Sequence, residues 1–116
     1  MIGNIVNEKG YISYSEYVLA NIVGLSTMEC YGVVGMASKN ATDGLWELLR
    51  GENLSRGVKI HSKSNELTIE LYIIVEYGTK ISVIATNIIQ KIKYNVEVYT
   101  GLKVISITVN VQGIRV

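Results

Sequence analysis

The sequence lacks proline and phenylalanine, and it has one cysteine, one histidine and one tryptophan among its 116 residues. The lone cysteine excludes an intrachain disulfide and a metal cluster built from the thiolates of one chain. A chain without disulfides is typical of a reducing compartment. The low cysteine content therefore indicates a protein that stays inside the cell.

Charge is also scarce, since charged residues make up 18% of the chain and the formal net charge is +1. Basic and acidic side chains are interspersed, so no polyanionic partner is implied and nucleic-acid binding is not expected. No segment approaches the ~20 apolar residues that a membrane-spanning helix requires, and residues 1–9 do not resemble a signal peptide. We expect a cytoplasmic protein without direct membrane insertion.

Hydrophobic residues, in contrast, make up 48% of the chain, and eight of them are tyrosines. The length fits one compact domain, and no linker, repeat or low-complexity tract divides residues 1–116. Tyrosine has an apolar ring and a hydroxyl group that needs a hydrogen-bond partner, so it suits half-buried and interface positions. We expect one domain that buries surface against a partner.

The N-terminal part predicts a strand at residues 2–6 followed by a helix that ends near Met28. Ser13 and Glu16 have the spacing of a capping box, which places the start of this helix. Its apolar stripe comprises Val18, Leu19, Ile22 and Leu25. Gly24 lowers helix stability by ~1 kcal/mol relative to alanine and permits close packing.

Two short elements are predicted next. Residues 33–37 form an apolar run between Gly32 and a polar stretch, which indicates a strand. Residues 43–49 have the pattern of a brief helix that Gly51 closes. Apolar and polar residues then alternate at 58–61 and at 67–75, with Ser64 and Asn65 between them, which predicts a hairpin with one buried face.

A long helix and a final strand complete the predicted order. Thr79 is placed to cap the helix and Gly101 to end it in the left-handed conformation. The apolar stripe of this helix comprises Ile81, Ile84, Ala85, Ile88, Ile92, Val96 and Tyr99. The last strand has apolar residues at Ile105, Ile107, Val109 and Val111 and ends at Gly113.

The predicted order of elements is therefore β-α-β-α-β-β-α-β, an α+β fold. Helices with one apolar stripe and strands with one apolar face bury both by packing as two layers. We expect the helices on one face of a mainly antiparallel or mixed sheet, whose opposite face stays partly exposed.

The sequence offers no evident catalytic machinery. His61 alternates with Lys59 and Lys63 on an outward face, away from any predicted carboxylate partner. Cys30 follows the end of a helix, where the helix dipole disfavours a thiolate. No G-x-S-x-G turn is present. We therefore expect no enzyme activity, no catalytic residues, no metal site and no cofactor.

Two further patterns have ordinary structural explanations. Glu70 and Glu76 fall at outward positions, where a carboxylate is solvated charge rather than part of an acid–base pair. Gly32 and Gly35 have the G-x-x-G spacing of a KH domain, but the residues between them are apolar and no basic patch surrounds them. A turn leading into a buried strand explains this spacing better.

One candidate interaction or anion site remains, at the start of the long helix. Gly78, Thr79 and Lys80 would offer free amides, the helix dipole and an ammonium group to an anion, with plain helix capping as the alternative. Ile74, Tyr72, Tyr77 and Tyr94 are expected to form an aromatic and aliphatic patch at the uncovered sheet face or its rim. Scattered half-buried tyrosines are the alternative reading of that patch.

Four segments together resemble the alkaline-shock-protein family, specifically its YloU-like branch. They are CYGVVGMASK at residues 30–39, ENLSRGV at 52–58, YGTKIS at 77–82 and VNVQGIRV at 109–116. Each is weak alone, but the four occur in the right order and spacing over nearly the whole chain.

The resemblance implies a Gram-positive bacterial protein linked to cell-envelope stress, non-enzymatic and prone to self-association. In some members it also implies attachment beneath the membrane through a separate anchor protein. We expect a homo-oligomer, a membrane-anchored protein partner and a membrane-proximal position through that partner. The alternatives are a small-molecule or acyl-phosphate sensor linked to lipid metabolism and, second, an RNA-binding module.

Overall fold

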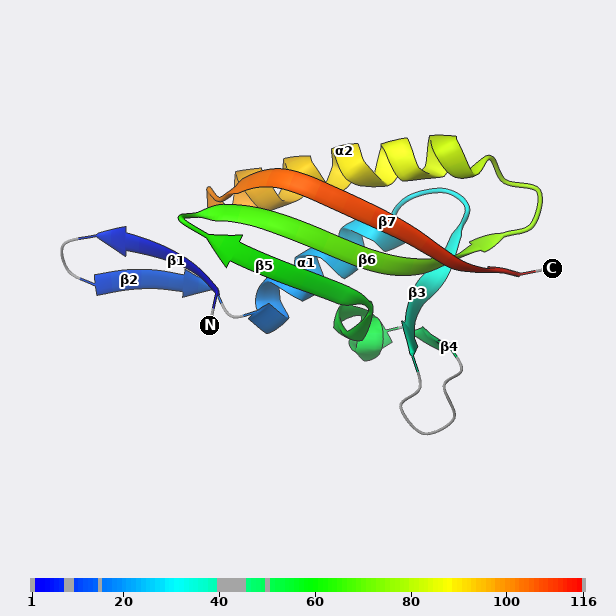
Figure 1. Ribbon diagram of the computed structural model, residues 1–116, viewed down its shortest axis with the longest axis horizontal. Coiled ribbons are helices and arrows are strands. Elements are labelled where there is room, and N and C mark those ends of the chain that lie inside the picture. The colour runs from blue at the N-terminus through cyan, green and yellow to red at the C-terminus, as the bar shows by residue number, and fades with distance from the viewer. Residues whose placement is uncertain (1, 8–9, 15, 40–45, 50, 116) are drawn as a thin grey trace.

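The computed structural model describes residues 2–7, 10–14, 16–39, 46–49 and 51–115 (Figure 1). The elements are β1 (Ile2–Asn7), β2 (Gly10–Tyr14), α1 (Glu16–Met28), β3 (Val33–Lys39), β4 (Trp46–Leu49), the 3-10 helix η1 (Gly51–Gly57), β5 (Val58–Lys63), β6 (Glu66–Glu76), α2 (Ile81–Thr100) and β7 (Lys103–Arg115). Strands β1 and β2 pair only with each other, and the other five strands form the main sheet. The two helices lie behind that sheet in Figure 1.

Strand β6 lies at the centre of the main sheet. It pairs antiparallel with β5 and β3 and parallel with β7, while β4 extends the sheet beyond β3. Successive side chains of a strand point to opposite faces, and β6 buries every second residue on the helix side: Leu67, Ile69, Leu71, Ile73 and Val75. Ser64 and Asn65 both adopt positive φ in the turn between β5 and β6, which suits a tight hairpin.

Helix α2 follows the predicted pattern closely. Ile84, Ile88, Ile92 and Val96 are buried against the sheet, at the spacing of one helix face. Ile81 and Tyr99 belong to the predicted stripe but are exposed, because they lie in the first and last turns. The helix ends at Gly101 in the left-handed conformation, as predicted.

Helix α1 requires a correction, because its buried face differs from the predicted stripe. Leu19, Ala20 and Val23 are buried, whereas Val18 and Leu25 are exposed. The helix is apolar on more than one face, so spacing alone does not decide which face packs. Gly24 lies on the buried face and allows a close approach of α1 to η1, since a Cβ at this glycine would lie 3.0 Å from Leu54 Cβ.

Two other predictions about the N-terminal half are wrong, and one strand is missing from them. A helix was expected at residues 43–49, but in the described part of this range Trp46–Leu49 is strand β4, and Gly51, expected to end the helix, begins η1. Strand β2 was not predicted, and it includes Ser13, so α1 begins at Glu16, after the predicted start. Residues 40–45 lie outside the described residues.

The last strand is longer and less regular than predicted. Leu67 pairs with Val104 and Thr68 with Ser106, so Ile105 lies in a bulge and is exposed. Ile107, Val109 and Val111 pack against the core but are only partly buried. The strand continues past Gly113 to Arg115.

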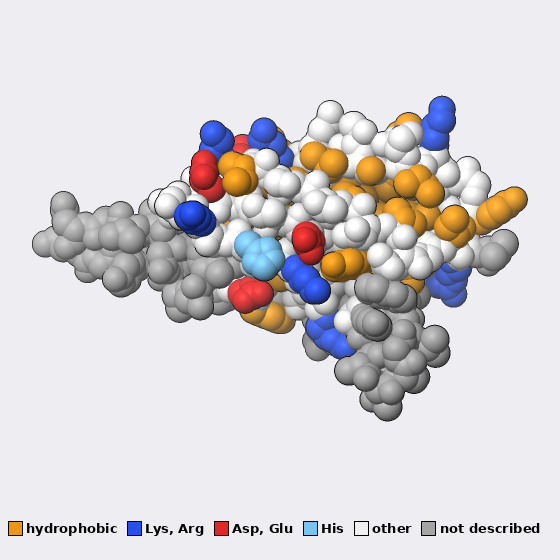
Figure 2. All heavy atoms as spheres, in the orientation of Figure 1, with side chains coloured by type: hydrophobic (Ala, Val, Ile, Leu, Met, Phe, Trp, Pro, Cys, Tyr) orange, Lys and Arg blue, Asp and Glu red, His pale blue; other side chains and the backbone are white. Residues whose placement is uncertain are grey.

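The predicted α+β class, with helices on one face of a mainly antiparallel or mixed sheet, is confirmed. The parallel β6–α2–β7 unit accounts for the mixed character of the sheet. Figure 2 shows the face without helices: hydrophobic side chains gather on one half, and charged side chains with His61 lie on the other. The open sheet face is therefore only partly polar.

Candidate functional site: a tyrosine-lined groove beside helix α2

A groove lies where the end of α1, the β6–α2 turn and the outer surface of α2 meet. It consists of two adjoining pockets of about 300 and 410 Å³ that share Tyr31 and Asn87. The first is lined also by Glu76, Tyr77, Gly78, Thr79, Lys80, Val83 and Ile84. The second is lined also by Glu29, Cys30, Gln90, Lys91 and Tyr94. We call the two pockets together the tyrosine groove.

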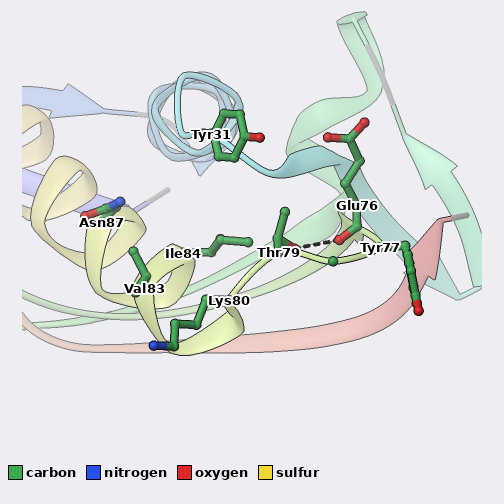
Figure 3. A pocket seen from close by; sticks show the side chains of 9 residues that line it. Tyr31, Glu76, Tyr77, Thr79, Lys80, Val83, Ile84 and Asn87 are labelled. Atoms are coloured by element: carbon green, nitrogen blue, oxygen red, sulfur yellow. Dashed lines mark hydrogen bonds between the residues drawn. The ribbon is translucent and has the colours of Figure 1, made fainter.

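The β6–α2 turn gives the groove one wall (Figure 3). Gly78 has a φ of 86°, a conformation that glycine adopts at no steric cost. The Thr79 hydroxyl donates to the Glu76 carbonyl oxygen over 2.5 Å, which closes the turn. The N-cap of α2 is Lys80 rather than Thr79, and no side chain caps the helix there. The predicted capping role of Thr79 is therefore wrong, because its hydroxyl donates to Glu76, which precedes it, and not to the first turn of α2.

Gly32 attaches the end of α1 to this turn. The Glu76 amide donates to the Gly32 carbonyl oxygen over 2.9 Å. Gly32 has a φ of 90°, and a Cβ there would lie 2.6 Å from Ile84 Cδ1. Only glycine fits both the conformation and the space. This contact brings Tyr31 beside α2.

The second pocket has one ion pair and the cysteine. Lys91 Nζ lies 3.9 Å from Glu29 Oε2, and both side chains are about half exposed. Burial raises the pKa of the Cys30 thiol, the Lys91 ammonium lowers it, and the Glu29 carboxylate raises it further. The thiol donates to the Ser26 carbonyl oxygen over 3.6 Å. The protonated thiol is the favoured form, as its position after a helix end predicts.

The first pocket has charges of both signs. Glu76 and Lys80 both line it, and Figure 3 shows their side chains pointing in different directions. A carboxylate beside the helix start opposes an anion there. The described residues hold no group of three or more histidine, cysteine or acidic side chains that could bind a metal.

The structure brings together five of the six predicted site residues. Tyr77, Gly78, Thr79 and Lys80 line the first pocket, and Tyr94 lines the second. Tyr72 is not part of this groove. It points from β6 to the open sheet face, where its hydroxyl donates to Glu70 Oε2 over 3.3 Å and Lys59 Nζ lies 5.5 Å from its ring centroid.

Sequence reasoning missed Tyr31, which both pockets share, and the α2 residues Val83 and Asn87. Tyr31 precedes Gly32 in a turn, and only the packing of that turn on α2 shows its position. Val83, Asn87 and Tyr94 are exposed on α2 away from its buried stripe. In the sequence, the available signal was that Val83 and Tyr94 fall outside the apolar stripe of the long helix, which leaves a valine and a tyrosine on its exposed side.

By its fold, the protein is a small two-layer α+β domain. It is similar to a variant of MamM-CTD, with a TM-score of 0.51 and 11% identity, covering 85% of this chain and 98% of that chain. This likeness concerns the fold alone. No described helix is long and apolar enough to cross a membrane.

The chain belongs to the alkaline shock protein 23 family, which is described as having a cell envelope-related function, and the match covers residues 4–116. The uncharacterized protein YloU of Bacillus subtilis is 50% identical over 92% of this chain and 90% of its own length. The uncharacterized protein Spy1614 of Streptococcus pyogenes is 42% identical over 96% of this chain and 93% of its own length. A stress response regulator gls24 homolog of Streptococcus pyogenes is 25% identical over 92% of this chain and 60% of its own length.

Proposed function

We propose that this chain maintains the cell envelope under stress without catalysing a reaction, by self-association and by binding a membrane-associated protein. The observation that carries the proposal is the exposure of three tyrosines around one groove: Tyr31 by 83%, Tyr77 by 74% and Tyr94 by 67%. Tyrosines are enriched where proteins bind proteins.

The surroundings of the groove support a protein partner. The exposed aliphatic side chain of Val83 lies on the same helix as Tyr94, so apolar surface continues along α2. The Lys91–Glu29 pair supplies polar groups at the margin. An apolar and aromatic centre with a polar rim is the usual anatomy of a protein interface.

The proposed location is the cytoplasmic side of the membrane, reached through the partner. The envelope-related function of the family supports this location. In this arrangement the partner supplies the anchor, and this domain supplies the tyrosine groove that docks on it. Binding to membranes should then depend on protein and not on lipid.

Membrane co-sedimentation tests the proposal directly. We expect the purified chain to sediment with native membranes, to lose that binding when the membranes are treated with protease, and not to sediment with protein-free lipid vesicles. A variant with Tyr31→Ser and Tyr94→Ser should bind at least tenfold more weakly, whereas Tyr17→Ser, an exposed tyrosine outside the groove, should not. Equal binding of both variants would contradict the proposed groove.

The first pocket favours a second candidate function, a small-molecule or acyl-phosphate sensor. Its volume of about 300 Å³ is at the lower end of the range for ligand sites, and Lys80 lines it. Glu76 in the same pocket opposes this function. A thermal shift with acetyl phosphate that Lys80→Gln removes would support it, and no shift at millimolar ligand would reject it.

A further inference from the structure

Strand β7 forms one margin of the main sheet and pairs only with β6 among the described strands. Its 13 residues make it the longest of the described strands, and none of these strands lies along its outer edge (Figure 1). Such an edge presents a row of backbone donors and acceptors to which another strand can pair.

The opposite margin differs in charge. Strand β5 exposes Lys59 and Lys63, and charged side chains of this kind protect an edge against pairing. Between Lys103 and Arg115, β7 has no charged residue. The two bulges, at Ile105 and between Val111 and Gly113, leave a regular uncharged stretch of six residues, 106–111.

Helix α2 leaves this edge room for one more strand. Figure 1 shows α2 running along the β7 margin and partly beyond it. Glu97 of α2 accepts the Val104 amide at 2.9 Å, so the helix already satisfies one backbone group at one end of β7. Farther along, Ile107, Val109 and Val111 remain only partly buried. An added strand would complete their burial and would rest on α2.

The position of α2 also excludes one occupant. If β7 of a second copy paired with β7 across a two-fold axis, the two α2 helices would compete for the same space behind the joined sheet. The occupant must therefore be a strand or hairpin that has no helix layer of its own.

The hairpin of β1 and β2 meets this requirement. It forms a separate two-stranded sheet that pairs with no strand of the main sheet and stands off one end of the molecule (Figure 1). A two-stranded hairpin is at best marginally stable in water, so it gains from further pairing. Strand β1 has six residues, the length of the uncharged stretch of β7.

We infer that the β1–β2 hairpin of one copy adds to the β7 edge of a second copy. This inference rests on the proposed self-association and names the surfaces that perform it. Each copy has one hairpin to donate and one edge to accept, and the two surfaces differ. The contact is therefore head-to-tail, so copies join into chains or closed rings.

Two variants separate the donor from the acceptor. Val109→Lys places an ammonium where an added strand would bury it, which disables the edge as acceptor. Val6→Pro removes a backbone amide in β1, which disables the hairpin as donor. His61→Lys adds the same charge on the opposite margin and serves as the matched control. Thr108→Lys, at an exposed β7 position, is a second acceptor variant if Val109→Lys unfolds the chain.

The test is light scattering over a concentration series, with circular dichroism to verify folding. The unchanged chain and His61→Lys should associate with rising concentration, and each disabled variant alone should raise the dissociation constant at least tenfold. An equal mixture of Val109→Lys and Val6→Pro should form a one-to-one dimer and nothing larger, because one intact edge meets one intact hairpin.

Each contrary result has a distinct meaning. A chain that stays monomeric at every concentration overturns the proposed self-association itself. Unaltered association of the acceptor variants overturns the role of β7 while self-association stands. Unaltered association of Val6→Pro overturns the hairpin as the occupant. The same conclusion follows if each variant alone is monomeric and their equal mixture is monomeric too.

Discussion

Asn95 of α2 donates from Nδ2 to Ser26 Oγ of α1 over 2.8 Å, a hydrogen bond between two helices that are 69 residues apart at this point. Ser26 is buried, and its own hydroxyl donates to the Ile22 carbonyl oxygen over 2.6 Å. This bond therefore helps to fix the relative position of the two helices, and Ser26 gives Asn95 its acceptor.

Ser26→Ala should lower the free energy of unfolding by about 1–2 kcal/mol, because Asn95 loses its partner in a half-buried position. Urea unfolding measures the loss. Thr86→Ala is the control, since Thr86 makes the same local bond, to the Ser82 carbonyl oxygen, but is exposed. It should change stability by less than about 0.5 kcal/mol. A double-mutant cycle of Ser26→Ala with Asn95→Ala that shows no coupling would contradict this account.

Gly57→Ala should destabilise the fold by about 1–3 kcal/mol through overpacking. A Cβ at this position would lie 2.8 Å from Met36 Cβ and 2.9 Å from the Ala37 carbonyl oxygen, and the backbone oxygen has little freedom to move. Gly113→Ala is the matched control, because its nearest neighbour would be Ile74 Cγ1 at 3.7 Å, an ordinary contact. Equal unfolding midpoints for the two variants would show that η1 tolerates the added methyl group.

Gly32→Ala and Gly78→Ala should differ although both glycines have positive φ. Alanine at Gly78 meets open space, so it should cost only the backbone strain, about 1 kcal/mol. Alanine at Gly32 should cost more, because its Cβ would lie 2.6 Å from Ile84 Cδ1. Comparison of their thermal unfolding measures the difference. A smaller loss at Gly32 than at Gly78 would mean that Ile84 moves aside freely.

The elements predicted well from the sequence are those whose pattern of apolar residues is compatible with only one secondary structure and one buried face. Strand β6 alternates strictly because one face is buried over its whole length, and α2 has one apolar stripe because only one side packs. These two elements and the hairpin turn at Ser64 and Asn65 were sufficient to predict the two-layer architecture.

The errors arise where the local sequence is compatible with more than one conformation or buried face, and tertiary contacts determine which one forms. Helix α1 has apolar residues around more than one face, and its packing on α2, η1, β5 and β3 selects Leu19 and Val23 for burial. The bulge at Ile105 exchanges the two faces of β7, which no alternation can predict. Likewise, Tyr31 and Tyr94 line one pocket because the turn after α1 packs on α2, so the groove could not be predicted from spacing.

Cys30 should react with iodoacetamide at a higher pH than an unperturbed cysteine, because burial raises its pKa. Reaction rates across a pH series give the midpoint, and the same chain in urea is the control. Lys91→Gln should move the midpoint further upward, because it removes the cation that lowers this pKa, and Glu29→Gln should move it downward.

The same shift predicts the sign of a stability effect. The folded state holds the thiol proton more tightly than the unfolded state, so the free energy of unfolding should fall as pH rises above the unfolded pKa of about 8.5. Cys30→Ser should remove this contribution. A midpoint in the folded chain at or below that in urea would contradict both predictions.

The central position of β6 determines how the molecule can open. Its amides face neighbours on both edges, β5 and β3 on one side and β7 on the other, so they become accessible to solvent only when the main sheet separates. The β1–β2 hairpin and the β4 end share no such dependence and can detach while the rest stays intact. Deuterium uptake should therefore reach the hairpin first and β6 last, and pairing between copies would slow the hairpin alone.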